Sequence, residues 1–89
     1  MNYLKFPLNQ CSGGSLVEVS LSGVESDVML VDQSNLMSFE SGRDFRYVGG
    51  HYKSSPVLLR TTSTSTWTVL VVPGQGGSVR ASVRVLPPV

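Results

Sequence analysis

Near the C-terminus, apolar and polar residues alternate strictly. Residues 79–85 place four apolar side chains on one face, and residues 66–72 place Trp67 and two valines on one face. A period of two is typical of a strand with one buried face. The glycine-rich residues 73–77 between these segments have hairpin length, so we expect the two strands to pair, with Trp67 opposite Val83.

The outward face of this expected hairpin is largely polar. Arg80 and Arg84 lie on it, across from Thr66 and Thr68, and Leu70 is its apolar exception. Two interpretations stay open: the arginines hold an anion or the carboxylate of a partner, or they are simply solvated. The connecting glycines suit a turn better than a phosphate cradle, because a strand follows them and the lysine of such cradles is absent.

Shorter β patterns recur along the rest of the chain. Expected strands cover residues 2–6 (ended by Pro7), 16–21, 28–31, 44–48 and 56–61. Residues 28–31 are apolar on both faces, as in a central strand. Turn signals recur about every ten residues, which is typical of a sandwich or barrel. We therefore predict an all-β fold: a compact, jelly-roll-like antiparallel β-sandwich of seven or eight short strands, forming a single domain over residues 1–89.

One stretch interrupts the β pattern, between residues 32 and 41. Asp32 or Ser34 can cap a short helical turn, since both side chains accept hydrogen bonds from the backbone N–H groups of a first turn. We expect this one short helical turn to carry Leu36, Met37 and Phe39 inward.

Composition agrees with a small globular domain. Of the 89 residues, 40% are apolar and 15% charged, and apolar runs such as residues 69–72 are too short to span a membrane. The first residues lack the pattern of a signal peptide, and the single cysteine, Cys11, suits a reducing compartment, so we expect a cytoplasmic protein. The net charge of +1 predicts no binding to nucleic acid or membrane.

Catalytic and metal-binding patterns are missing from the sequence. His51 is the single histidine, and neither it nor Cys11 has a second ligand at metal-site spacing. A Cys11–His51 nucleophilic pair lacks an orienting acid nearby, and no serine stands in a nucleophile elbow. We therefore expect no enzyme, no cofactor and no metal.

Residues 42–52 are chemically the densest part of the chain. Arginine offers a planar fork for a carboxylate or phosphate, tyrosine a stacking ring, and glycine close access to the backbone. Two interpretations stay open: a hairpin with Phe45 and Tyr47 in the core and a turn at the two glycines, or a binding site for a ligand or partner. The predicted site residues are Arg43, Arg46, Tyr47, Gly49, Gly50, His51 and Tyr52.

The order of several short motifs resembles the bacterial DUF1883 family over nearly the whole chain. The most specific motifs are Tyr47-Val48-Gly49-Gly50 and Val79-Arg80-Ala81-Ser82-Val83-Arg84-Val85; Ser12-Gly13-Gly14 and Ser55-Pro56-Val57 add to them. The resemblance implies a small β-sandwich that occurs alone or beside TIR domains, without an established activity. The TIR association implies a role in defence or signalling.

Two functional hypotheses follow. The first is a non-catalytic protein-interaction module that self-associates or recruits a protein partner through a free strand edge and outward apolar residues such as Leu70 and Leu86. The second is a pocket for a small anionic ligand, including one derived from a nucleotide, held by the arginines of residues 42–52.

Overall fold

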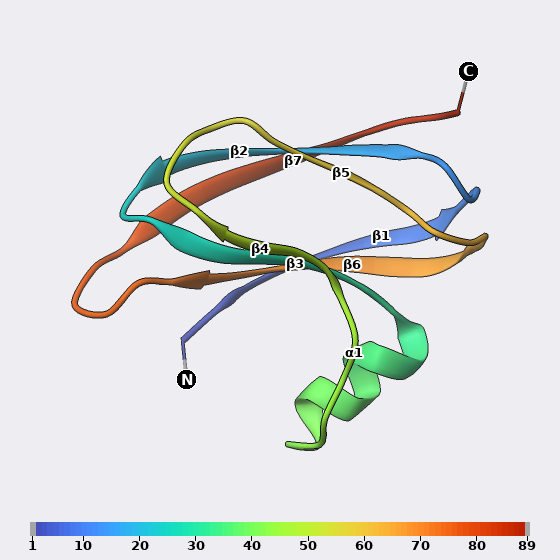
Figure 1. Cartoon of the computed structure of the whole chain (residues 1–89), viewed down its shortest axis with the longest axis horizontal. Coiled ribbons are helices and arrows are strands. Elements are labelled where there is room, and N and C mark those ends of the chain that lie inside the picture. Colours follow the sequence, from blue (N-terminus) through green and yellow to red (C-terminus); the bar gives the residue numbers. More distant parts are fainter. Residues whose placement is uncertain (1, 89) are drawn as a thin grey trace.

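The computed structural model describes residues 2–88 and folds them into two antiparallel sheets that pack face to face (Figure 1). The elements are β1 (Leu4–Cys11), β2 (Leu16–Gly23), β3 (Ser26–Asp32), α1 (Gln33–Glu40), β4 (Val48–Tyr52), β5 (Val57–Arg60), β6 (Ser65–Pro73) and β7 (Val79–Leu86). One sheet has the strand order β1-β6-β3-β4 and the other β5-β2-β7. The predicted antiparallel β-sandwich is confirmed, with seven strands and one short helix in the described chain.

The chain changes sheet at every connection except the one that runs through α1. This repeated crossing from sheet to sheet gives the fold its jelly-roll-like character. Strands that neighbour each other in a sheet are therefore mostly distant in the sequence. Within residues 2–88, no helix is long and apolar enough to cross a membrane.

The core between the sheets consists of aliphatic side chains and one indole. Its buried members are Cys11, Val17, Val19, Val28, Leu30, Val57, Leu59, Trp67, Val69 and Val71. The inner side chains of β7 pack against the same core but keep part of their surface in solvent. The inward faces predicted for residues 66–72 and 79–85 are thus correct. Burying one such aliphatic side chain stabilises the fold by about 1.5–3 kcal/mol.

The hairpin predicted from β6 and β7 is wrong, because the two strands belong to different sheets. β6 pairs with β1 and β3, whereas β7 pairs along its whole length with β2. The β6–β7 connection bonds to the β2–β3 connection instead: the N–H of Gly74 donates to Glu25 (2.9 Å) and the N–H of Val24 donates to Ser78 (3.1 Å). A side chain at Gly77 would collide with Val24, so glycine permits this close approach. The apolar faces of β6 and β7 meet across the sandwich rather than side by side.

The outer face of the larger sheet is covered by α1, which corrects the outward placement of Leu70. Leu70 is fully buried in a second cluster with Met29, Val31 and Leu36. β6 therefore has two buried faces, although threonines on one of them make it look half-polar. Met37, expected to point inward, is 56% exposed. It therefore lies on the solvent side of the helix.

Asp32 caps the helix; it is one of the two residues, with Ser34, that the sequence offered as the cap. Its Oδ1 accepts a hydrogen bond from the backbone N–H of Asn35 (3.0 Å). This bond satisfies a first-turn donor that has no partner within the helix. The helix is eight residues long, about two turns, where one was expected.

β1 does not end at Pro7, as the sequence suggested. It continues to Cys11, and its register with β6 shifts between Pro7 and Asn9, where Asn9 has a φ of 62°. Proline is tolerated because β1 lies at the edge of its sheet, where a missing N–H need not cost a ladder bond.

Candidate binding surfaces

The residues of the predicted binding segment do not form a glycine turn. Residues 43–47 run as an irregular connection, and Gly49 and Gly50 lie inside β4, opposite Met29 and Val28 of β3. Gly49 has a φ of 141°, and a side chain there would collide with the carbonyl oxygen of Val28. The hairpin is therefore wrong, because the two glycines bring β4 close to β3. Of its two expected core residues, Phe45 packs against the second cluster, whereas Tyr47 is 49% exposed.

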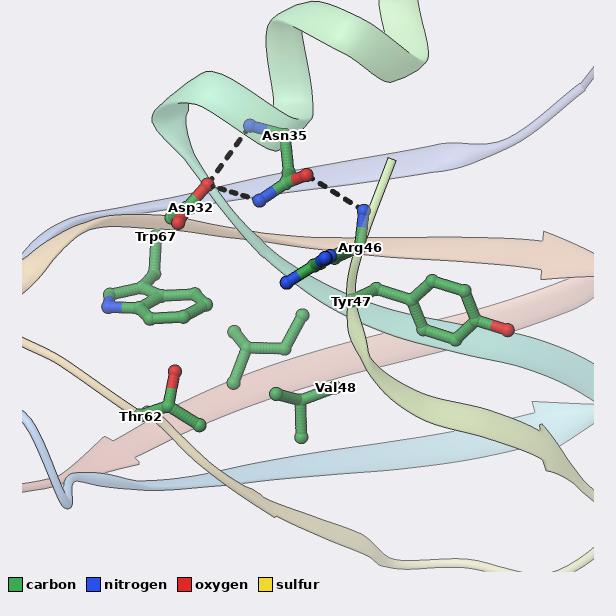
Figure 2. A pocket seen from close by; sticks show the side chains of 8 residues that line it. Asp32, Asn35, Arg46, Tyr47, Val48, Thr62 and Trp67 are labelled. Carbon is green, nitrogen blue, oxygen red and sulfur yellow. Dashed lines mark hydrogen bonds between the residues drawn. The ribbon is translucent and has the colours of Figure 1, made fainter. Parts of the chain in front are cut away.

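β4 divides the predicted site residues between its two ends. Arg46 and Tyr47 lie before its start, beside the first turn of α1, and line a pocket there (Figure 2). His51 and Tyr52 lie at the other end, and five extended residues span about 16 Å. Arg43 is exposed, and its backbone N–H closes the end of α1 by donating to the carbonyl of Ser38 (2.8 Å). Of the predicted site residues, Arg46 and Tyr47 are thus the two that line this pocket together.

His51 is engaged by carboxylates of its own chain. Its Nδ1 lies 2.7 Å from Oδ1 of Asp27, the residue opposite on β3, and its Nε2 lies 3.4 Å from Oε1 of Glu25. Lys53 approaches the same Glu25 (3.9 Å). The hydrogen bond to Asp27, and then the one to Glu25, raise the pKa of His51 above its usual 6.5. Among the described residues, no group of three or more potential ligands is arranged to hold a metal ion.

The pocket beside Arg46 was only partly visible in the sequence. Its remaining lining residues are Leu30, Asp32, Asn35, Val48, Thr62 and Trp67. They come from β3, α1, the start of β4, the β5–β6 connection and β6. No local motif joins them, because only the crossing of the chain between the sheets brings these segments to one end of the sandwich.

Four strands form the edges of the two sheets, and three of them are poorly suited to pair with another strand. β1 contains Pro7 and the irregularity at Asn9, β4 has only five residues, two of them glycines, and β5 has only four. Proline, irregular register and shortness are the features that block sheet edges in natural proteins. β7, in contrast, has eight residues in uninterrupted register with β2, and no proline.

The free edge of β7 carries two kinds of side chain. Val79, Ala81, Val83 and Val85 point toward the core and remain partly exposed. Arg80 and Arg84 point outward; Arg84 pairs with Glu18 of β2 (3.0 Å), and Arg80 takes part in no ion pair between described residues. The sequence predicted that these arginines point outward. It did not show that β6 does not pair with β7 and so leaves this edge free.

Comparison with known proteins identifies the family. The family model described as "Domain of unknown function (DUF1883)" matches residues 1–89. No curated protein and no solved structure matches the chain. The match covers the whole length, from β1 to β7, and agrees with the resemblance found in the motifs. The chain therefore belongs to the DUF1883 family.

Proposed function

We propose that this domain is a non-catalytic interaction module that recruits a partner protein by accepting an extended segment of it as a new strand beside β7. The observation that supports the proposal is the edge of β7, which is long, regular and free of the features that block β1, β4 and β5. A free edge presents a row of backbone N–H and C=O groups that another strand can bind.

The backbone of β7 is bonded on one side only. Its ladder runs to β2, from Leu16 opposite Leu86 to Gly23 opposite Val79, and it pairs with no other strand in the described chain. A peptide strand on the second side exchanges backbone–water hydrogen bonds for backbone–backbone bonds and covers the half-exposed inner valines. Both changes favour strand addition.

The side chains indicate what such a segment contains. The outer face of the smaller sheet carries three arginines, Arg60, Arg80 and Arg84, and one carboxylate, that of Glu18. β2 shows the matching pattern, because its Glu18 lies opposite Arg84 while its valines point into the core. We therefore expect the partner segment to alternate apolar residues with acidic ones, which face Arg84 and Arg80.

A second copy of the chain fits this edge less well. Two antiparallel β7 strands centred on Ser82 place Arg80 of one copy opposite Arg84 of the other. Like charges directly opposite each other destabilise a strand pair. The arginines therefore select an acidic partner over self-association.

A peptide that copies the pattern of β2 tests the proposal. The peptide Leu-Val-Glu-Val-Ser-Leu-Glu-Val is β2 with Ser22 replaced by glutamate and Gly23 by valine, so that its glutamates face Arg84 and Arg80. We expect saturable binding by fluorescence anisotropy, and slower hydrogen exchange of those β7 amides that point to the free edge. A peptide with lysine in place of both glutamates should bind much more weakly.

The variant Arg80→Glu should weaken binding of this peptide by about tenfold, because an attraction becomes a repulsion. Arg43→Glu is the matched control, since it makes the same charge change on an exposed residue of a different surface. If both variants weaken binding equally, the effect comes from the net charge of the protein and not from a contact at the β7 edge, and the proposal is overturned. A stable dimer in sedimentation experiments, with β7 amides protected in the absence of peptide, would show that a second copy occupies the edge instead.

A further inference from the structure

A pocket of about 280 Å³ opens at the end of the sandwich where α1 begins. It is separate from the free edge of β7: none of its lining residues belongs to β7. Pockets for drug-sized ligands occupy about 300–1,000 Å³, so this one suits a small molecule. An inference about this pocket therefore goes beyond the proposed recruitment of a partner strand.

The floor of the pocket is apolar and rigid. Leu30 is fully buried, Trp67 is 3% exposed, and Val48 begins β4 beside them. The indole Nε1 of Trp67 donates to the carbonyl oxygen of Ser63 (2.9 Å), which fixes the orientation of the ring. Because Leu30 is fully covered, a flat or short apolar group finds its preformed contact surface on the half-buried Val48 and the small exposed part of Trp67.

The rim of the pocket is polar, and a hydrogen-bond relay holds it in place. The side-chain Nδ2 of Asn35 donates to Oδ1 of Asp32 (2.9 Å), and its Oδ1 accepts from the backbone N–H of Arg46 (2.7 Å). These bonds join the helix start to the segment that enters β4. The position of the Arg46 backbone is therefore set by α1 and not by the irregular connection alone.

The guanidinium of Arg46 points over the pocket, toward the side of Trp67 (Figure 2). It takes part in no ion pair between residues 2–88. The carboxylate in the same pocket, Asp32, is already engaged, because its Oδ1 lies within hydrogen-bond distance of the backbone N–H and side chain of Asn35 and of the hydroxyl of Ser34 (3.4 Å). Arg46 is thus a cation over an apolar floor without a carboxylate partner of its own.

We infer that this pocket binds a small organic anion, a carboxylate or phosphate monoester on a single flat or short apolar body. Arg46 binds the anionic group through charged hydrogen bonds. Val48 and the small exposed part of Trp67 contact the apolar body, with Leu30 buried beneath them. The hydroxyl of Thr62 borders the pocket, whereas the ring of Tyr47 extends away from Arg46 and Trp67 (Figure 2). The two parts of the ligand gain from different residues: Arg46 binds the anionic group most strongly, and the apolar floor adds contact only for the body.

The only tryptophan of the chain lies in the pocket, so its fluorescence reports on occupancy. Benzoate and phenyl phosphate serve as the carboxylate and phosphate probes, with acetate and inorganic phosphate to test the need for a ring. We expect at least one ring-bearing anion to shift the Trp67 emission saturably, with matching NMR shifts at Tyr47 and Thr62, and the ring-free anions to bind far more weakly. If neither ring-bearing anion saturates at millimolar concentration, the inference is wrong.

Arg46→Gln keeps the backbone N–H that binds Asn35 but removes the charge. We expect it to weaken binding by roughly tenfold to a hundredfold, the effect of losing a charged hydrogen bond. Arg43→Gln, a nearby exposed arginine that does not line the pocket, should bind as the unaltered chain does. Binding by Arg46→Gln at full strength would overturn the inference. Arg80→Glu should leave this titration unchanged, so the proposals for the pocket and for the β7 edge are tested independently.

Discussion

The side chain of Asn35 accepts a hydrogen bond from the backbone N–H of Arg46 at 2.7 Å, across eleven residues of chain. The same carboxamide donates to Asp32, the helix cap, at 2.9 Å. One polar side chain therefore ties the irregular segment before β4 to the first turn of α1.

Removing this tie should loosen the segment. Asn35→Ala deletes two side-chain hydrogen bonds, and each contributes about 0.5–1.5 kcal/mol, so we expect the free energy of unfolding to fall by about 1–3 kcal/mol. Hydrogen exchange at the amide of Arg46 should become much faster. Ser38→Ala is the control on the same helix, because its backbone bond to Arg43 is retained. An Arg46 amide that stays protected in Asn35→Ala would contradict this role.

Trp67 and Arg84 should differ sharply in their effect on stability. Trp67 is 3% exposed in the core, and Trp67→Ala should cost about 3–5 kcal/mol through lost contacts and a cavity. Arg84 makes an exposed ion pair with Glu18, and Arg84→Ala should cost less than about 1 kcal/mol. Thermal and urea unfolding measure both. If the two variants melt alike, the assignment of inward and outward faces in β6 and β7 is wrong.

The cluster around His51 predicts a dependence of stability on pH. Hydrogen bonds to Asp27 and Glu25 raise the pKa of His51 in the folded state above 6.5, so the protonated ring stabilises the fold. This contribution is fully present below pH 6.5 and is lost as the pH rises through the folded pKa. In a series measured from about pH 5 to about pH 9, this contribution to the melting temperature should stay constant up to about pH 6.5 and fall above it.

The matched variant for this experiment is His51→Gln, which retains polarity but does not titrate. Its melting temperature should lie below that of the unaltered chain at low pH and approach it at high pH. Direct NMR titration of the imidazole should give a midpoint above 6.5. A midpoint below that value, or parallel melting curves at all pH values, would show that the carboxylates do not hold the charged ring.

Cys11 should react slowly with thiol reagents. It is 5% exposed, and burial raises the pKa of its thiol, so the reactive thiolate is scarce at neutral pH. We expect little modification by a disulfide reagent in the folded protein and complete modification in urea. Rapid stoichiometric reaction without denaturant would mean that the β1 end of the core opens readily.

From the sequence, the inward and outward faces of a strand were easier to predict than the strands that pair with it. A period of two places Trp67 inward, but it contains no information on which strand lies beside β6. Leu70 was misassigned because it shares its face with Thr68, a polar residue that is nonetheless 3% exposed beneath the covering layer. The local pattern of residues did not indicate that α1 covers this face of the sheet.

For the candidate sites, too, local features were predictable and long-range arrangement was not. The arginines Arg46 and Arg80 were recognised from their chemistry alone, and both now lie on proposed binding surfaces. Their surroundings were not predictable: the pocket combines residues from β3, α1, the segment before β4, β4 itself, the β5–β6 connection and β6, and the free edge of β7 exists because β6 crosses to the other sheet. Site chemistry was local, whereas site geometry depended on long-range strand pairing.

The crossing connections also constrain how the chain acquires its fold. β1 bonds only to β6 in its sheet, and β2 bonds to β5 and β7, so most strand pairs join residues far apart in sequence. Closing such long loops costs entropy before any contact is gained, which places domains of this kind among the slower folders, in milliseconds to seconds. During synthesis, β1 remains without its strand partner until β6 has left the ribosome. The first third of the chain therefore becomes ordered only when the last third is available. A ribosome that stalls before β6 would hold a chain whose larger sheet is incomplete.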